Sequence, residues 1–136
     1  MNVIVCIDDA GGMLFNRRRQ SKDKVLRQQA RMLAQGQPLW MNSYTESQFA
    51  EDGFEMIAEE TFLEHAPENA WCFVENSDLM PFINRIQKIA VYRWNRMYPS
   101  DVKFPMDQFA GKWRLISTRE FEGSSHERIT EEVYCL

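Results

Sequence analysis

Residues 3–16, VIVCIDDAGGMLFN, join an apolar run to a turn signal and a second apolar run. The first five residues are apolar on both faces, which is typical of a strand buried inside a largely parallel sheet. Gly11 and Gly12 follow two aspartates, and such a pair wraps a phosphate, forms a tight turn or lets a flat ligand approach the backbone. The stretch predicts a central strand followed by a glycine loop whose role bears directly on function.

Length and composition narrow the class of protein. A chain of 136 residues with 44% hydrophobic and 26% charged residues predicts one globular domain spanning 1–136. The net charge of −4 disfavours a general nucleic-acid binder. No stretch approaches the roughly 18 apolar residues of a membrane span, and the N-terminus lacks a signal-peptide pattern. Cys6 and Cys72 lie in apolar runs, so we expect free thiols, a cytoplasmic location and no membrane partner.

Apolar runs alternate with helical patterns through the first two thirds of the chain, which favours βαβ units. Helices are predicted over 22–35 with Ser21 as cap, over about 45–53 with Thr45 and Gln48 as a capping box, and from residue 77 or 78. Strands are predicted at 39–42, 54–58, 71–74 and 88–94. Residues 112–121 and 127–136 alternate apolar and polar side chains and predict an antiparallel hairpin. The expected fold class is α/β, with three α/β/α layers, a mostly parallel sheet and an antiparallel C-terminal hairpin.

Three blocks in order carry a resemblance to a known family. They are VCIDDAGGMLFN (5–16), KIAVYRWNRMYPSDVKFP (88–105) and the Trp-containing KWRLISTREFEG…EEVY (112–134). Together they resemble dihydrofolate reductase, in a diverged and shortened form. LWMNSYTES (39–47) stands where that family has Met-Gly-Arg-x-Thr, and WCFVENSDLMPFINRI (71–86) stands at its strand, Gly-Gly and helix segment. The resemblance implies a dihydrofolate reductase-like fold.

Departures from the family pattern bear on its NADPH cofactor. Glu75 and Asn76 replace the glycine pair that lets the backbone approach the pyrophosphate, and Asn42 and Ser43 replace a glycine and a phosphate-binding arginine. Leu14 replaces a glycine that lies against the nicotinamide, and the chain is shortened between 49 and 71. We therefore expect a degenerate cofactor site and no cofactor; if one binds, the resemblance implies NADPH.

The substrate half of the family's cleft is better preserved. Asp23 is the nearest match to the carboxylate that holds the pterin, and it would be the catalytic residue; a first-turn aspartate that favours the helix dipole is the alternative. The positions that match the ligand cleft are Cys6, Ile7, Gly12, Met13, Leu14, Thr45 and Tyr92. Tyr92 replaces a small hydroxyl residue and either contacts a ligand or plugs the pocket.

Other constellations have plainer interpretations. The basic run NRRRQSKDK (16–24) predicts a solvated loop, with a small anionic ligand as the alternative. Asp8 and Asp9 are expected to form the turn beside the glycine pair. Ser124, Ser125 and His126 lie on a predicted hairpin tip without a third catalytic member.

Histidine count bears on metal chemistry. Some small bacterial proteins that resemble this one carry a ribonuclease Z label, but the only histidines, His65 and His126, cannot hold two zinc ions. We expect no metal site.

The sequence thus predicts a cytoplasmic binding or interaction protein that has lost NADPH-dependent reduction. Its partner would be a small ligand or a protein, or a second copy that buries the cleft face. The alternative is a residual reductase, or another pterin- or nucleotide-handling enzyme, that uses Asp23.

Overall fold

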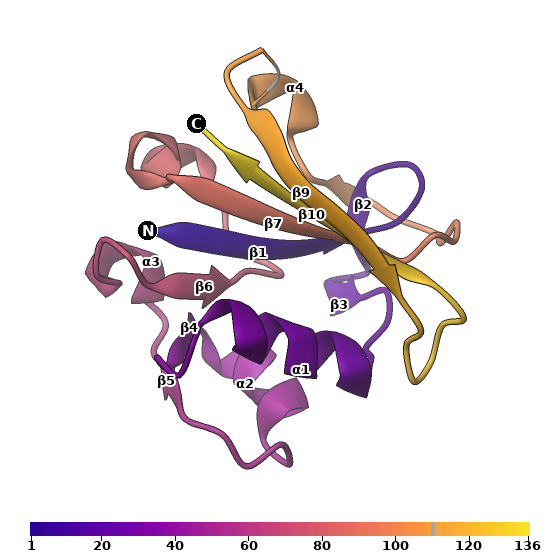
Figure 1. The fold of residues 1–136 in the computed structure, drawn as a ribbon, viewed down its shortest axis with the longest axis horizontal. Coiled ribbons are helices and arrows are strands. Elements are labelled where there is room, and N and C mark those ends of the chain that lie inside the picture. The colour runs from indigo at the N-terminus through magenta and orange to yellow at the C-terminus, as the bar shows by residue number, and fades with distance from the viewer. Residues whose placement is uncertain (110) are drawn as a thin grey trace.

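A seven-stranded mixed sheet organises the protein, in a computed structural model that describes residues 1–109 and 111–136. The strand order is β5-β4-β6-β1-β7-β10-β9 (Figure 1). The strands are β1 (Asn2–Ile7), β4 (Leu39–Met41), β5 (Met56–Ala58), β6 (Trp71–Phe73), β7 (Lys88–Arg93), β9 (Arg114–Phe121) and β10 (Ile129–Cys135). The first five in spatial order pair in parallel, whereas β10 runs antiparallel to both β7 and β9. The α/β class and the antiparallel C-terminal hairpin are confirmed.

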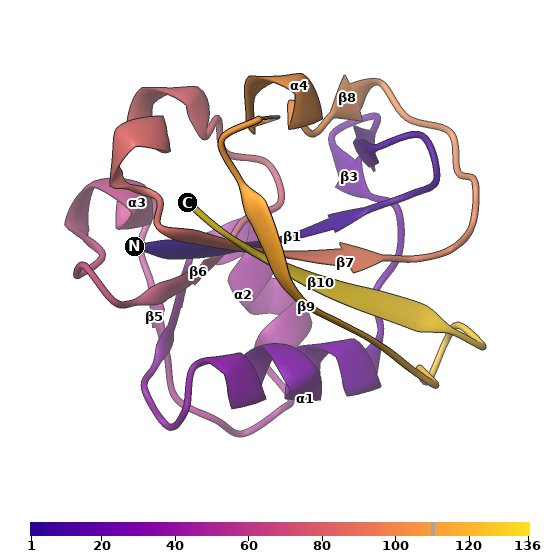
Figure 2. The same ribbon diagram turned by 45° about the horizontal axis from the view of Figure 1, so that its top comes forward.

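Helices cover both faces of the sheet (Figures 1 and 2). On one face lie α1 (Lys24–Leu33) and α2 (Ser43–Phe49), which bury Leu26, Ala30 and Phe49 against the strands. On the other lie α3 (Phe62–His65), the 3-10 helix η1 (Met80–Arg85) and α4 (Met106–Phe109). None of the helices in the described ranges is long and apolar enough to cross a membrane.

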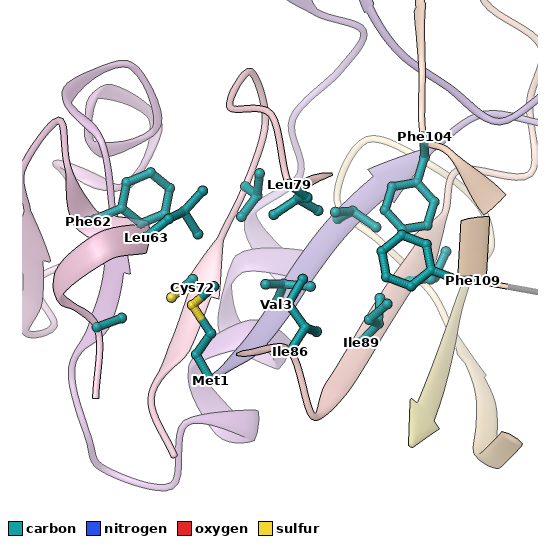
Figure 3. Packing of buried hydrophobic residues seen from close by; sticks show 14 of the residues in the cluster. Met1, Val3, Phe62, Leu63, Cys72, Leu79, Ile86, Ile89, Phe104 and Phe109 are labelled. Carbon is teal, nitrogen blue, oxygen red and sulfur yellow. The ribbon is translucent and has the colours of Figure 1, made fainter. Parts of the chain in front are cut away.

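The two faces of β1 explain its continuous apolar run. Val3, Val5 and Ile7 point into one hydrophobic cluster, while Ile4 points into the other. Figure 3 shows the first cluster, in which Val3 lies among side chains from α3, β6, β7 and α4. Because both faces are covered, polar residues at alternate positions of the strand centre would be buried, and none is present.

A second, three-stranded sheet was not predicted from the sequence. It contains β2 (Gly12–Phe15), β3 (Arg18–Arg19) and β8 (Val102–Lys103), in the order β3-β2-β8. Asn16 and Arg17 join β2 to β3 with φ values of 52° and 63°, the left-handed pair of a tight hairpin. From the basic run 16–24, this sheet holds Arg18 and Arg19, in β3.

Several helix boundaries differ from the prediction. The cap of α1 is Asp23, not Ser21, because its carboxylate accepts a hydrogen bond from the Leu26 N–H. The cap of α2 is Asn42, not Thr45, and this helix ends at Phe49. The predicted helix from residue 77 or 78 is a short 3-10 helix with Pro81 in its first turn, and α3 and α4 had no sequence signal strong enough to predict them.

Candidate functional site

The glycine loop after β1 is organised by Asp8. This fully buried carboxylate accepts hydrogen bonds from the N–H groups of Ala10 (2.9 Å) and Gly12 (2.8 Å) through Oδ1, and from the Tyr98 N–H (3.1 Å) through Oδ2. Burial opposes ionisation, but these backbone donors outweigh it and lower the pKa of Asp8. Gly11 has a φ of 79°, and a Cβ on Gly12 would lie 2.5 Å from the Ser100 Cβ. The loop is therefore a tight turn whose amides bind an internal carboxylate.

An ion pair lies in the cleft at the carboxyl ends of β1, β4 and β6, hereafter the carboxyl-end cleft. Arg19 in β3 donates from Nε to Glu75 Oε2 (2.8 Å) and from a terminal nitrogen to Oε1 (3.1 Å). The Arg19 guanidinium also donates to the Tyr44 carbonyl (2.9 Å) and lies 4.2 Å from the centre of the Tyr44 ring. Burial lowers the pKa of Arg19. The hydrogen bond to Glu75 outweighs the effect of burial, so the pKa of Arg19 is raised overall. Planar contacts on three sides fix the guanidinium in place.

The positions that match the family's phosphate site hold internal partners. Asn42 donates from Nδ2 to Asn76 Oδ1 (2.7 Å) and accepts from the Thr45 N–H through Oδ1 (3.1 Å). Ser43 donates both its N–H (3.1 Å) and its hydroxyl to Glu60 Oε1, and the hydroxyl bond is the main reason that the pKa of Glu60 is lowered. A carboxylate of the chain itself therefore occupies the first amide of α2, and the Asn42 side chain occupies that of Thr45.

Asp23 ties the start of α1 to the tip of the β9–β10 hairpin. Its Oδ1 accepts from the Leu26 N–H (3.0 Å), and its Oδ2 accepts from the Ser125 N–H (2.7 Å) and hydroxyl (2.8 Å). Only 2% of Asp23 is exposed. Burial raises the pKa, but the Ser125 and Leu26 donors outweigh it and lower the pKa from 3.8 to about 2. The carboxylate is ionised and fully engaged within the protein.

The Arg19–Glu75 pair divides the space at this end of the sheet. A hollow of about 350 Å³ stays open on the Asn76 side, against Met13, Leu79 and Phe104, and little space remains on the Asp23 side. A residual cavity of about 10 Å³ lies among Cys6, Met13, Arg19, Asp23 and Glu75, which is room for at most about one water molecule. Of the seven predicted cleft residues, Cys6 and Met13 line this cavity. Ile7 packs into the hydrophobic cluster on the opposite face of the sheet. Leu14 is buried in β2 and Thr45 is buried in α2. Gly12 donates its N–H to Asp8 in the glycine loop.

Tyr92 is completely buried and belongs to a separate polar network. Its hydroxyl donates to Glu131 Oε2 (2.6 Å), and Glu131 also binds Arg119 through a 2.9 Å contact between Oε1 and Nε. Burial, together with the nearby Glu131 charge, raises the pKa of Tyr92. The side chain lies in the hydrophobic cluster beneath α1 and does not line the residual cavity of the carboxyl-end cleft.

The Ser125–His126 neighbours do not form a hydrolytic triad. Ser125 Oγ lies 2.7 Å from His126 Nδ1, but the carboxylate of Asp23 binds the serine rather than the histidine. His126 Nε2 faces the Tyr98 hydroxyl at 2.6 Å, and the His126 ring stacks on Trp94. Within residues 1–109 and 111–136, no three His, Cys, Asp or Glu side chains gather as a metal site.

Sequence reasoning missed three residues that shape the carboxyl-end cleft: Arg19, Tyr44 and Glu60. Arg19 was assigned to a solvated loop, whereas it is the counter-charge of Glu75. A negative residue in place of a glycine could have signalled a nearby cation, but the sequence offers several arginines of equal standing in the run 16–24.

The fold defined by this sheet is that of dihydrofolate reductase. The chain is similar to the dihydrofolate reductase of Enterococcus faecalis, solved in complex with NADP(H) and RAB-propyl, with a TM-score of 0.67. The match covers 98% of this chain and 94% of that one at 11% sequence identity. No protein-family model matches the chain, and neither does any curated protein sequence. At this identity, the likeness shows a shared fold and leaves activity to be argued from the site.

Proposed function

We propose that this chain is a binding or interaction protein of the cytoplasm, built on a dihydrofolate reductase-like fold and without NADPH-dependent reduction. The observation that carries the proposal is the Arg19–Glu75 pair, which leaves about 10 Å³ between Cys6 and Asp23, while a separate hollow of about 350 Å³ stays open on the Asn76 side of the pair. Ligand pockets generally measure about 300–1,000 Å³. A pterin ring beside Asp23 would have to displace this pair.

Internal hydrogen bonds support the same conclusion at the surrounding positions. Glu60 takes the amide that a cofactor phosphate would take, and Asn42 binds Asn76 across the gap. Asp23, the nearest match to the pterin-binding carboxylate, is saturated by Leu26 and Ser125. Opening the site would leave several charged or polar groups without partners, which costs about 1–3 kcal/mol for each group.

Ligand-dependent thermal unfolding tests this proposal. A ligand that binds only the folded state raises the unfolding midpoint, and the stabilisation grows with the logarithm of the ligand concentration once this exceeds the dissociation constant. We expect no rise with NADPH, folate or dihydrofolate, and no NADPH oxidation when dihydrofolate is added. The double variant Glu75→Gly, Asn76→Gly, which restores the family's glycine pair, serves as a matched variant with a widened cleft.

A clear shift with NADPH in the unmodified protein would overturn the proposal. A residual reductase predicts such a shift and also predicts that Asp23→Asn abolishes turnover while NADPH still binds. Binding of dihydrofolate without NADPH would instead indicate a pterin-binding protein, and would contradict the filled cleft.

A further inference from the structure

An aromatic pocket lies on the face of the sheet opposite α1, between α4 and the strands β7 and β10. It has a volume of about 340 Å³, which is within the range of small-molecule sites. Figure 3 shows part of its lining, where Phe104 and Phe109 lie next to each other and close to Ile89. Phe104 also borders the open hollow beside Asn76. We call this space the α4 pocket.

Strands β7 and β10 supply the floor of the α4 pocket. Ile89 and Val91 are two residues apart on β7, so their side chains point to the same face of the sheet. Tyr134 on β10 is the register partner of Ile89 and is half-buried. The Tyr134 hydroxyl donates to Glu132 Oε1 (3.1 Å), so its polar group already has a partner. The floor therefore offers aliphatic and ring surface to a ligand.

Three more aromatic rings line the wall of the α4 pocket. Phe104 and Phe109 are buried and stack on each other, with ring centres 5.3 Å apart and an angle of 12° between the planes. Trp113 is half-buried, and its ring centre lies 5.6 Å from that of Phe109 at an angle of 57°. The face of an aromatic ring carries partial negative charge. A lining with four such rings favours a cation over an anion.

Asp107 adds a full negative charge to this lining. It is the only charged side chain among the described residues that border the α4 pocket. Its carboxylate is exposed and takes part in none of the ion pairs in the part of the chain that the structure describes. Lys112 and Arg114 flank Trp113 along the chain, but neither borders the pocket. The charge of the described lining is therefore negative and is not balanced from within it.

We propose that the α4 pocket binds a small organic ammonium ion. The cationic head would lie between Trp113, Tyr134 and Asp107, and the alkyl part would lie against Ile89 and Phe109. A neutral ligand would leave Asp107 unused, and an anion would meet both the carboxylate and the ring faces. An ammonium ion within about 6 Å of a ring centre is attracted to the ring, most strongly to an indole.

This inference goes beyond the proposed loss of reduction and does not depend on it. The residues that line the α4 pocket are different from those that line the residual cavity beside Asp23. Binding in the α4 pocket and binding of a pterin would therefore change the NMR signals of different residues, so that the failure of one proposal leaves the other standing.

An NMR titration that resolves backbone amides and indole N–H groups tests the proposal with three compounds of similar shape. Choline is the cation, the alcohol in which carbon replaces the choline nitrogen is the neutral analogue, and the carboxylate with the same tert-butyl group is the anion. We expect concentration-dependent shifts centred on Phe109, Trp113 and Tyr134 with choline. The neutral alcohol should bind about tenfold more weakly, because it keeps the apolar contacts and lacks the charge, and the carboxylate should bind more weakly still.

Variants of Asp107 and Trp113 assign the contacts. Asp107→Asn should weaken choline binding about fivefold and leave binding of the neutral alcohol unchanged, because only the Coulomb attraction is lost. Asp9→Asn, at an exposed aspartate beside the glycine loop, is the matched control and should change neither. Trp113→Leu should weaken choline binding about tenfold, whereas Trp113→Phe keeps an aromatic face and should weaken it less than about threefold. Asp107 is exposed, so Asp107→Asn decides the question even if Trp113→Leu unfolds.

Four results would overturn the assignment. They are the absence of shifts at tens of millimolar choline, equal affinity for choline and the neutral alcohol, an equal effect of the two aspartate variants, and shifts centred on Cys6 and Glu75. Equal affinity would mean that the α4 pocket selects apolar shape alone. Tighter binding of the carboxylate than of choline would contradict the negative character of the lining.

Discussion

Removal of the Glu75 carboxylate is the sharpest test of how the carboxyl-end cleft is kept closed. In Glu75→Ala, the Arg19 guanidinium loses both of its charged hydrogen bonds and keeps only the Tyr44 carbonyl at 2.9 Å and the face of the Tyr44 ring. The two side chains of the pair are only 20% and 9% exposed, so solvent replaces the lost partner poorly.

The expected loss in the free energy of unfolding follows from this partial burial. Breaking a fully buried pair from one side costs about 3–5 kcal/mol, and an exposed pair contributes about 0–1 kcal/mol, so we expect about 2–3 kcal/mol. Urea unfolding monitored by tryptophan fluorescence measures this loss in the free energy of unfolding. Arg19→Ala should cost a similar amount, because it leaves the Glu75 carboxylate without its cation. The double variant Arg19→Ala, Glu75→Ala should cost about 1–2 kcal/mol less than the sum of the two single variants.

An exposed pair in the same protein provides the control. Glu120 lies 3.4 Å from Arg128, with side chains 55% and 69% exposed, so Glu120→Ala should change the free energy of unfolding by less than about 0.5 kcal/mol. Equal effects of Glu75→Ala and Glu120→Ala, or strict additivity of the two cleft variants, would refute the view that this pair holds the cleft closed.

Three further predictions concern the polar contacts and close approaches around α1. Asp23→Asn should lower the free energy of unfolding at neutral pH by about 1–2 kcal/mol after allowance for solvent screening, because an amide N–H₂ would face the Ser125 N–H. The folded pKa of Asp23, about 2, lies below the ordinary 3.8, so its stabilisation is complete above about pH 4 and is lost as the pH falls toward 2; urea midpoints across this range should lose that slope in the variant. Gly123→Ala should cost about 1–3 kcal/mol by thermal unfolding, since the new Cβ would lie 2.4 Å from Asp23 Oδ2; a neutral result would mean that the hairpin tip shifts freely. Tyr92→Phe should cost about 1–2 kcal/mol through loss of the 2.6 Å bond to buried Glu131, and an unchanged urea midpoint would contradict that role.

Local patterns were sufficient for the sheet and its hairpin. β1 is apolar on both faces, and β10 alternates apolar and polar side chains; each pattern is set by neighbours within the strand and by the layers that cover it. Caps were harder, because Ser21, Asp23, Asn42 and Thr45 are all capable acceptors. Which side chain reaches the free N–H groups at the start of the helix depends on the position and direction in which the preceding segment ends.

The sequence by itself determined the fold class and the departures at Leu14, Asn42, Ser43, Glu75 and Asn76, since these are properties of single positions. Only the tertiary structure decided what those departures do. Arg19 and Glu75 are 56 residues apart along the chain, and Asp23 and Ser125 are 102 residues apart. Pairs at such separations meet only after the sheet has formed, and many arginines and serines are equivalent candidates beforehand.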